Sequence, residues 1–403
     1  MTQNIFIARQ PIFDREYKLA SYELLFRNHK QQQTDEHMTA QVMTTALLDI
    51  GLDKLSGGYK VNINAPASFL LGKLEMLHTL PPNQVGIEIL ETVPVTEAII
   101  AACKTLKHQG FTILLDDVVY APHLKPLVEL ADIIKVDLPR IRNLEEEVKI
   151  LRQYPARILA EKVETYQQFE QVKALNFDYV QGYFFSKPEV IQGQKIADAK
   201  LSILRALQQV MKAQAISDIH DVIKSDVSLS YRLMKYINSA SLGVKKTIES
   251  IEQALALLGL NHVRRWLSLL ALATLGQNKT SELLKTALIR AYTLENIARQ
   301  CREKEVGDDF LLGMFSILDA LLDVSMQDAI QDLYLPHGVR EGLLDASSMM
   351  GQKLSMCKSL EQGDWHAVET WALKGKRIEI THIMRIYTDA LAWSDTQVAQ
   401  IIS

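Results

Sequence analysis

Residues 85–117 read VGIEILETVPVTEAIIAACKTLKHQGFTILLDD, and this stretch decides the fold of the N-terminal half. The runs VGIEILE (85–91) and FTILLDD (111–117) are short and almost continuously apolar. Between them, residues 96–110 carry apolar side chains three and four positions apart and end on Gly110, as an amphipathic helix with a glycine stop does. Strands that are apolar on both faces and alternate with helices predict a parallel sheet covered by helices.

The same alternation continues to about residue 190. Further apolar runs occupy residues 5–13, 19–26, 59–65, 132–138, 157–164 and 179–185. Together with the first two runs they give eight strand candidates, of which all but the earliest fit parallel pairing. That number favours a closed barrel over an open sheet. We therefore expect an α/β, TIM-like (β/α) barrel over residues 1–195.

The strand pattern ends after about residue 195. Residues 216–240 and 281–305 have helical spacing, and the second stretch carries one continuous apolar stripe of the kind that a helix buries in a core. Ser250 and Gln253 predict the start of another helix, and Gly259 predicts its end. We expect an all-α helical domain over residues 196–403, joined to the barrel through a helix at 196–212.

Composition excludes several classes of protein. The chain has 403 residues, 48% of them apolar and 23% charged, with a net charge of −4, so no basic excess indicates a nucleic-acid polymer or an anionic membrane as partner. The three cysteines, Cys103, Cys301 and Cys357, are too scattered for a disulfide framework or a zinc site. The N-terminus lacks the pattern of a signal peptide, and no apolar run is long enough to span a bilayer. We expect a cytoplasmic protein.

Polar side chains gather where the predicted strands end, which is where a (β/α) barrel keeps its active site. They are Glu23, Arg27, Asn62, Glu88, Glu91, Asp116, Asp117, Lys135, Asp137, Glu161, Glu164 and Gln181. The adjacent acids Asp116 and Asp117 could cap the following helix or hold a cation. A ring of acids with one lysine is costly without a compensating cation, and this favours the second interpretation.

The candidate ligand atoms are all oxygens, which suit Mg²⁺ or Mn²⁺ rather than zinc. The acids are too many for one divalent ion, so we expect two ions, with Asp116 between them and Asp117 on the second. Such a pair suits phosphodiester hydrolysis, because it activates water and neutralises charge on the phosphorus.

Six motifs in order resemble the EAL domain, the cyclic di-GMP phosphodiesterase barrel. They are ELLFR (23–27), VNIN (61–64), IEILET (87–92), IIKVD (133–137), AEKVET (160–165) and VQGYFFSKP (180–188). The resemblance implies a first metal ion on Glu23, Asn62, Glu88 and Asp116, and a second on Asp116, Asp117 and Glu161. It also implies that Lys135 orients the attacking water, that Glu161 and Gln181 complete the catalytic site, that Arg27 contacts a phosphate, and that Glu91 and Glu164 anchor the loop after Asp117.

Two departures from that family stand beside the candidate site. The loop after the paired aspartates reads VVYAPH and lacks the glycines that are usual there, and Val118, Val119 and Tyr120 resist the turns that glycine allows. Lys162 stands where a glycine is usual. The chain thus keeps the candidate ligands but changes the loop that links them to the substrate.

Residues 222–243, 248–272 and 310–324 resemble the HDOD domain, a helical relative of the metal-dependent HD phosphohydrolases. Ser316 and Ile317 stand where an HD enzyme carries its His-Asp pair. The dipeptide His220-Asp221 lies on an early helix without further ligands at suitable spacing, so we interpret it as surface polar residues. The resemblance implies a non-catalytic domain that binds a protein partner.

Three functions remain open from the sequence. The first is an enzyme that hydrolyses cyclic di-GMP to linear pGpG. The second is a catalytically inactive receptor for cyclic di-GMP that signals through the HDOD domain, and the third is a scaffold. The retained acids favour the first, the altered loop favours the second, and the third leaves the acids unexplained. Homodimerisation stays open as well. The resemblance further implies a bacterial signal-transduction role of the kind that controls motility and biofilm formation.

Overall fold

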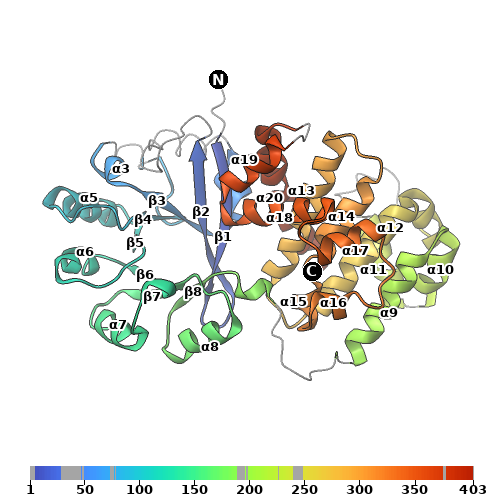
Figure 1. Ribbon diagram of the computed structural model, residues 1–403, viewed down its shortest axis with the longest axis horizontal. Coiled ribbons are helices and arrows are strands. Elements are labelled where there is room, and N and C mark those ends of the chain that lie inside the picture. The colour runs from blue at the N-terminus through green and yellow to red at the C-terminus, as the bar shows by residue number, and fades with distance from the viewer. Residues whose placement is uncertain are drawn as a thin grey trace.

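The computed structural model describes residues 5–28, 47, 50–72, 77, 79–187, 196, 198–225, 227–238, 248–374 and 378–402. Its N-terminal half is a closed barrel whose eight strands follow chain order (Figure 1). The strands are β1 (Ile5–Asp14), β2 (Leu19–Asn28), β3 (Lys60–Ala65), β4 (Val85–Ile89), β5 (Thr112–Leu115), β6 (Ile133–Asp137), β7 (Arg157–Glu161) and β8 (Tyr179–Gln181). The predicted barrel is confirmed.

The first strand differs in direction from the others. β1 runs antiparallel to both β2 and β8, whereas every other neighbouring pair from β2 to β8 is parallel. Because β1 and β2 are joined by a tight turn, no crossover helix lies between them. The outer side of this hairpin therefore needs a cover from elsewhere in the chain.

Short helices follow the parallel strands, and their ends match local sequence signals. They are α2 (Leu52–Ser56), α3 (Ala67–Gly72), α5 (Glu97–His108), α6 (Lys125–Val128), α7 (Leu144–Leu151) and α8 (Tyr166–Ala174). The Thr96 side chain caps α5, and Gly110 follows that helix with a φ of 95°, as the predicted glycine stop requires. Thr165 and Gln168 form a reciprocal capping box at the start of α8.

The C-terminal half is helical, as predicted. Its helices are α9 (Asp198–Lys212), α10 (Ile216–Ser225), α11 (Val227–Ile237), α12 (Ile251–Leu275), α13 (Ser281–Gln300), α14 (Val306–Phe315), α15 (Leu318–Leu322), α16 (Met326–Ala329), α17 (His337–Leu344), α18 (Met349–Gln362), α19 (Trp365–Leu373) and α20 (Ile380–Ile402). Ser250 caps α12 as expected, and the helical conformation is interrupted at Gly259, where the sequence predicts a helix end. Gly259 has a φ of 73° and kinks the helix, which then resumes.

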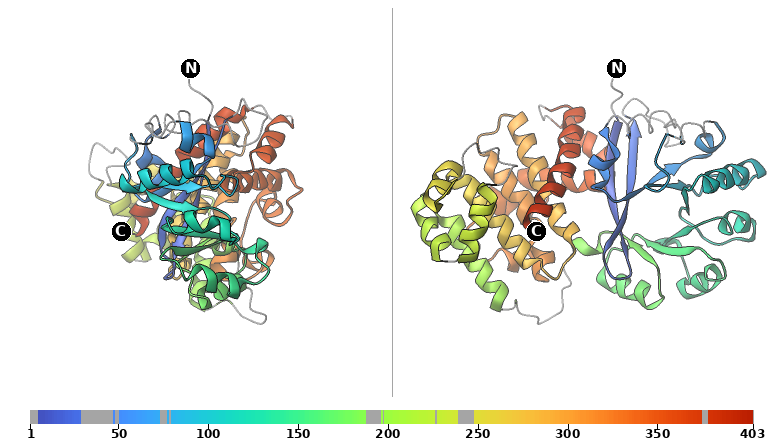
Figure 2. Two further views of the ribbon diagram at one scale, coloured as in Figure 1. Left: turned by 90° about the vertical axis from the view of Figure 1, so that its left-hand side faces the viewer. Right: turned by 180° about the vertical axis from the view of Figure 1, so that it is seen from behind.

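Two apolar cores organise the described residues. One runs without interruption through the barrel and most of the helical half, and a smaller one joins parts of α9–α12. The helical half lies on one side of the barrel (Figure 1 and the right view of Figure 2). In the part of the chain that the structure describes, every helix is too short or too polar to cross a membrane.

The helical half supplies the missing cover of the β1–β2 hairpin. Helices α18 and α20 pack against β1 (Figure 1). The rings of Phe6 on β1 and Trp365 on α19 lie 5.8 Å apart between centroids. Gly363, which follows α18, approaches β2 closely, since a Cβ there would lie 2.8 Å from Cδ1 of Leu25. The barrel and the helices therefore form one packed unit.

A buried cluster of polar side chains crosses the same interface. Arg9 of β1 makes a two-pronged ion pair with Asp395 of α20, with N–O distances of 2.8 and 3.0 Å. The hydroxyl of Tyr22 on β2 donates to Glu282 of α13 at 2.8 Å. Lys285 completes the cluster with ion pairs to Glu282 (2.7 Å) and Asp395 (3.0 Å). Strands of the barrel and helices far along the chain are thus tied together by charge as well as by apolar packing.

Candidate metal centre

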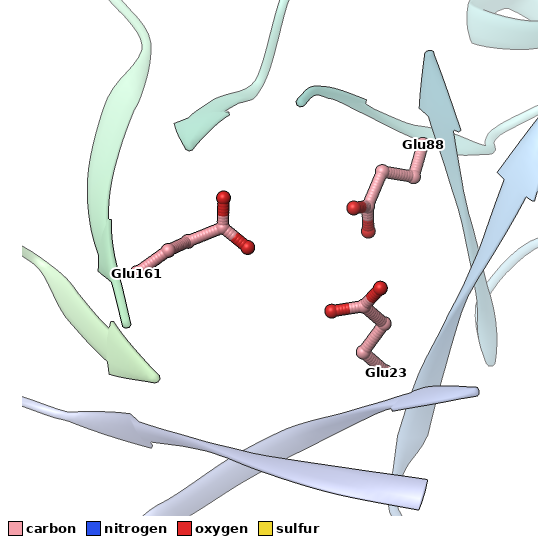
Figure 3. A group of neighbouring side chains, drawn as sticks. All are labelled: Glu23, Glu88 and Glu161. Carbon is pink, nitrogen blue, oxygen red and sulfur yellow. The ribbon is translucent and has the colours of Figure 1, made fainter. Parts of the chain in front are cut away.

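Three strands bring three carboxylates to one buried point inside the barrel. Glu23 comes from β2, Glu88 from β4 and Glu161 from β7, and each is at most 6% exposed. Because side chains alternate along a strand, Glu88 points inward while Ile87 and Ile89 face the helices. One oxygen of each acid lies within 4.8 Å of the others, and Figure 3 shows the three side chains pointing toward one another.

Lys135 of β6 lies at the centre of these acids. Its Nζ is 2.7 Å from Glu161, 3.0 Å from Asp116 and 3.3 Å from Glu23, and it also donates to Glu88. Four carboxylates thus share one ammonium group. Burial lowers the pKa of Lys135, but the surrounding carboxylates raise it well above its ordinary value, so it is charged at neutral pH.

The carboxyl groups around Lys135 outnumber the one ammonium group that they share, and burial together with this imbalance raises the pKa of some of them. Burial and then the neighbouring Glu23 raise the pKa of Glu88 well above its ordinary value. Burial raises the pKa of Glu161 to about 8. Among the described residues, Glu88 Oε2 and Glu161 Oε2 are buried without a hydrogen-bond partner. Carboxylate oxygens without a partner are ligands of the kind that a hard divalent cation takes, and such a cation would favour the charged form of these acids.

A second, more exposed acidic group adjoins the first. Oxygens of Glu91, Asp116 and Asp117 also lie within 4.8 Å of one another. Asp116 links the two groups, because it belongs to the second while its Oδ1 also pairs with Lys135, which the acids of the first group surround. The paired aspartates therefore lie beside the buried acids, and their role as a ligand shared between two ions stays a prediction.

The structure corrects the placement of one predicted ligand. Asn62 points toward the amino ends of the strands: its Nδ2 lies 3.4 Å from the Ser21 hydroxyl, and it lines a cavity of about 410 Å³ there. The Asn62 side chain packs closely against Gly86 of β4, since a Cβ at Gly86 would lie 2.4 Å from Asn62 Oδ1. Asn64, two residues later on the same face of β3, lies 3.4 Å from Glu23 Oε1 and takes the expected place. The motif VNIN offers two asparagines with the same parity, and the sequence interpretation chose the wrong one.

We expect Asn64→Ala to lower the affinity for Mn²⁺ on the order of tenfold, because it removes a polar neighbour of Glu23. Asn62→Ala is the matched control and is expected to change the affinity less than about twofold, because its contacts lie at the other end of the barrel. Calorimetric titration of both variants with Mn²⁺ checks this. An equal or larger loss in the Asn62 variant would contradict the correction.

Gln181 joins the site, and a chain of hydrogen bonds continues from it into the helical half. Its Nε2 donates to Glu23 (2.6 Å) and to Gln10 Oε1 (3.1 Å). Gln10 donates to the hydroxyl of Tyr183 (3.2 Å), which donates to the backbone carbonyl of Glu361 in α18 (2.6 Å). Sequence reasoning missed Gln10 and Tyr183, although Tyr183 lies inside the motif that contains Gln181.

The loop after Asp117 makes contacts that sequence reasoning did not include. The backbone N–H of Tyr120 donates to Glu147 of α7 at 2.6 Å, and the hydroxyls of Tyr120 and Tyr154 are 2.8 Å apart. Glu164, one expected anchor, pairs instead with Lys187 at 2.7 Å. The loop is therefore tied to a neighbouring helix of the barrel.

Two further predicted residues need comment. Glu91, the other expected anchor, belongs to the second acidic group. Arg27 is a backbone member of β2, but its side chain lies outside the described residues. Its expected contact with a phosphate stays a prediction.

The helical half has an ion pair near the place of the HD residues. Arg290 of α13 forms a two-pronged pair with Glu361 (2.7 Å each) and donates to the Ser316 hydroxyl at 3.1 Å. His220 contacts Glu252 at 3.1 Å, and the side chain of Asp221 lies outside the described residues. Both acidic groups that could hold a cation among the described residues lie in the barrel.

Comparisons with known proteins agree with this architecture. The EAL domain family matches residues 24–188, and the HDOD domain family matches residues 196–339. The protein YuxH of Bacillus subtilis, whose function is uncharacterised, is 34% identical over 96% of this chain and 98% of its own. The cyclic di-GMP phosphodiesterase CdgJ of Vibrio cholerae is 30% identical over 96% of this chain and 92% of its own.

Among solved structures, the EAL-domain protein YkuI of Bacillus subtilis, in complex with cyclic di-GMP and calcium, is 17% identical. The match covers 63% of this chain and 71% of the YkuI chain, with a TM-score of 0.39. The two relatives match almost from end to end, and the two family matches follow each other in the order of the barrel and the helices. This chain belongs to the family of proteins in which an EAL domain is followed by an HDOD domain.

Proposed function

We propose that this chain is a signal-transduction protein whose barrel binds cyclic di-GMP and hydrolyses it to linear pGpG with the help of divalent cations. The observation that carries the proposal is the buried group of Glu23, Glu88 and Glu161 around Lys135, with Asp116 beside it. The relative CdgJ, named a cyclic di-GMP phosphodiesterase, supports the choice of substrate. The hydrolysis adds water to one phosphorus and breaks one P–O bond of the cyclic dinucleotide.

Each residue of the site has a role that its contacts allow. The ligands would be Glu23, Asn64, Glu88, Asp116, Asp117 and Glu161. Bound Mg²⁺ or Mn²⁺ would neutralise charge on the phosphoryl group and lower the pKa of water. Lys135, which stays charged, would donate a hydrogen bond to the attacking water, and Gln181 holds the Glu23 carboxylate in position. Arg27 would contact a phosphate of the nucleotide.

The helical half would carry the signal to a protein partner. Its Arg290–Glu361 pair lies near Ser316, where the HD enzymes have a His-Asp pair, and we assign it no catalysis. A chain of hydrogen bonds runs from Glu23 through Gln181, Gln10 and Tyr183 to α18, and it connects this half to the site. A receptor without turnover is the second candidate, and the loop that Glu147 and Tyr154 hold in place favours it.

Purified full-length protein, incubated with cyclic di-GMP and Mn²⁺, tests the proposal. We expect binding, and formation of linear pGpG at less than the ~10 per second that is typical of enzymes, because the altered loop holds the site less often in working geometry. Separation of the linear product and calorimetry of nucleotide binding measure the two steps. Binding of cyclic di-GMP without formation of pGpG would contradict the enzyme and favour the receptor as the function. Neither binding nor cleavage with Mg²⁺, Mn²⁺ or Ca²⁺ would contradict the nucleotide assignment and leave the scaffold.

A further inference from the structure

Two cations of the chain already face the outer acidic group, which contains Asp117. Arg140 Nη1 lies 3.0 Å from the Asp117 carboxylate and 3.8 Å from Glu91. Lys162 Nζ lies 3.8 Å from Asp117 and 2.5 Å from Asp137, and Arg140 Nε is 3.3 Å from Asp137. The same carboxylates that would help to hold a second divalent ion are thus bound by side chains of the protein.

The backbone of Lys162 is held in a conformation that lysine seldom adopts. It follows the buried ligand Glu161 at the end of β7 and has a φ of 56°, in the left-handed region that glycine adopts readily and that lysine seldom does. The ammonium of this unusual residue contacts Asp137, of which the side chain is almost completely buried. Such strain persists only where the surroundings hold the residue in place.

The two acidic groups differ in charge balance. In the buried group, the carboxylates of Glu23, Glu88, Glu161 and Asp116 share Lys135, and no other cationic side chain of the described residues pairs with them. In the outer group, Arg140 lies within 4 Å of the carboxylates of Glu91 and Asp117, and Lys162 lies within 4 Å of Asp117; both cations also pair with the adjoining Asp137. The buried group thus has four carboxyl groups to one cationic side chain, whereas Glu91, Asp117 and Asp137 have two cationic side chains among three carboxyl groups.

We propose that Lys162 and Arg140 are built-in cations that make the two ion positions of this barrel unequal: the buried group takes up one divalent ion tightly, and the outer group takes up its ion weakly. The inference rests on the proposed function, because it concerns the ions of the same site. A divalent ion at Asp117 must displace the two cations from that carboxylate or bind beside them, and like charges a few ångströms apart repel. Lys162 and Arg140 are positioning residues, since they act through Asp117 and Asp137.

The inequality connects the two candidate functions. A barrel with only its buried ion in place can hold the nucleotide, but it lacks part of the charge that phosphodiester hydrolysis requires. Turnover would then follow the concentration of free divalent ion, or the movement of Lys162 away from Asp117. Lys162 is 52% exposed and Arg140 is 48% exposed, so both side chains have room to move.

Mn²⁺ titration of the full chain without nucleotide tests this proposal, with bound and free ion followed by calorimetry and electron paramagnetic resonance. The main variant is Lys162→Asn, because asparagine tolerates the left-handed conformation and carries no charge. Arg140→Gln is a second, independent variant that leaves the backbone at residue 162 unchanged. Lys173→Asn is the matched control, since Lys173 is a similarly exposed lysine (57%) whose partner is Glu170 of the same helix.

In the unmodified protein we expect one tight Mn²⁺ and a second that binds at least about tenfold more weakly. Lys162→Asn and Arg140→Gln are each expected to tighten the second ion by roughly tenfold and to leave the first unchanged, whereas Lys173→Asn changes neither. Two ions of equal affinity in the unmodified protein, or a second ion that neither variant tightens, would overturn the inference and leave the proposed function standing. Failure to bind any Mn²⁺ would overturn both.

Discussion

Asp116→Asn is expected to lower the rate of cyclic di-GMP hydrolysis by on the order of a thousandfold. Asp116 links the two acidic groups: its Oδ1 is 3.0 Å from Lys135, and it neighbours Glu91 and Asp117. Asparagine keeps the shape of the side chain and removes its charge. The substitution therefore weakens both candidate ion positions at once, whereas a change at Glu88 or Asp117 touches one.

The measurement is the rate of pGpG formation with saturating Mn²⁺, together with the Mn²⁺ affinity in the absence of nucleotide. Asp132→Asn is the control, because Asp132 adjoins the opposite end of β6 and asparagine can still accept the hydrogen bond from the Ile113 N–H. The control is expected to keep its rate within about twofold. Unchanged hydrolysis and unchanged Mn²⁺ affinity in Asp116→Asn would contradict the assignment of the site.

The barrel could be predicted because its strands are buried on both faces. Such strands read as continuous apolar runs, and the intervening helices have their own periodicity and caps, such as Thr96 and Gly110 around α5. Each local signal agreed with the next along the chain. The interruption at Gly259 was predicted, but the helix that resumes directly after it was not, because a glycine that ends a helix and a glycine that kinks it have the same local signature, and packing decides between them.

Most residues of the candidate site could also be proposed from the sequence, because parallel strands in a barrel place their carboxyl ends at one rim. The choice between Asn62 and Asn64 was not, since both face the interior and a shift of two residues changes only the depth at which the side chain lies. Glu147 was missed for another reason. It holds the loop from a helix outside the strand ends, and no periodicity indicates such a contact.

The contact between the two halves was the feature least accessible to sequence reasoning. Arg9 and Asp395 are separated by almost the whole chain, and each reads as an ordinary charged residue within its own segment. The β1–β2 hairpin has no crossover helix, so its outer side needs a cover, but only the structure shows that α18 and α20 provide it. The boundary between barrel and helices at about residue 195 is therefore a boundary in sequence more than in packing.

Arg9→Ala is expected to lower the free energy of unfolding of the full chain by about 3–5 kcal/mol, because it breaks a buried ion pair and leaves a partner without compensation. The Arg9 side chain is 3% exposed, donates to both oxygens of Asp395 and to the backbone carbonyl of Leu55, and lies 4.4 Å from the centre of the Tyr22 ring. Lys285 remains near Asp395 and Glu282 in the variant, but one ammonium cannot replace the two-pronged guanidinium and its contact with Leu55.

Urea unfolding of the full chain, followed by circular dichroism and by tryptophan fluorescence, measures this loss. Arg15→Ala is the matched control: Arg15 lies beside the same hairpin and pairs with Asp178, but its side chain is 48% exposed, so the loss is expected to stay below about 1 kcal/mol. Trp365 and Trp371 lie in the helical half and are mostly buried, so their fluorescence reports on that half. Since one apolar core joins the halves, the two signals are expected to report one common transition in the unmodified protein, and a weakened interface is expected to separate them. If Arg9→Ala destabilised the chain no more than Arg15→Ala does, the ion pair would contribute nothing to holding the halves together, and the apolar contacts of α18 and α20 with β1 would account for the interface alone.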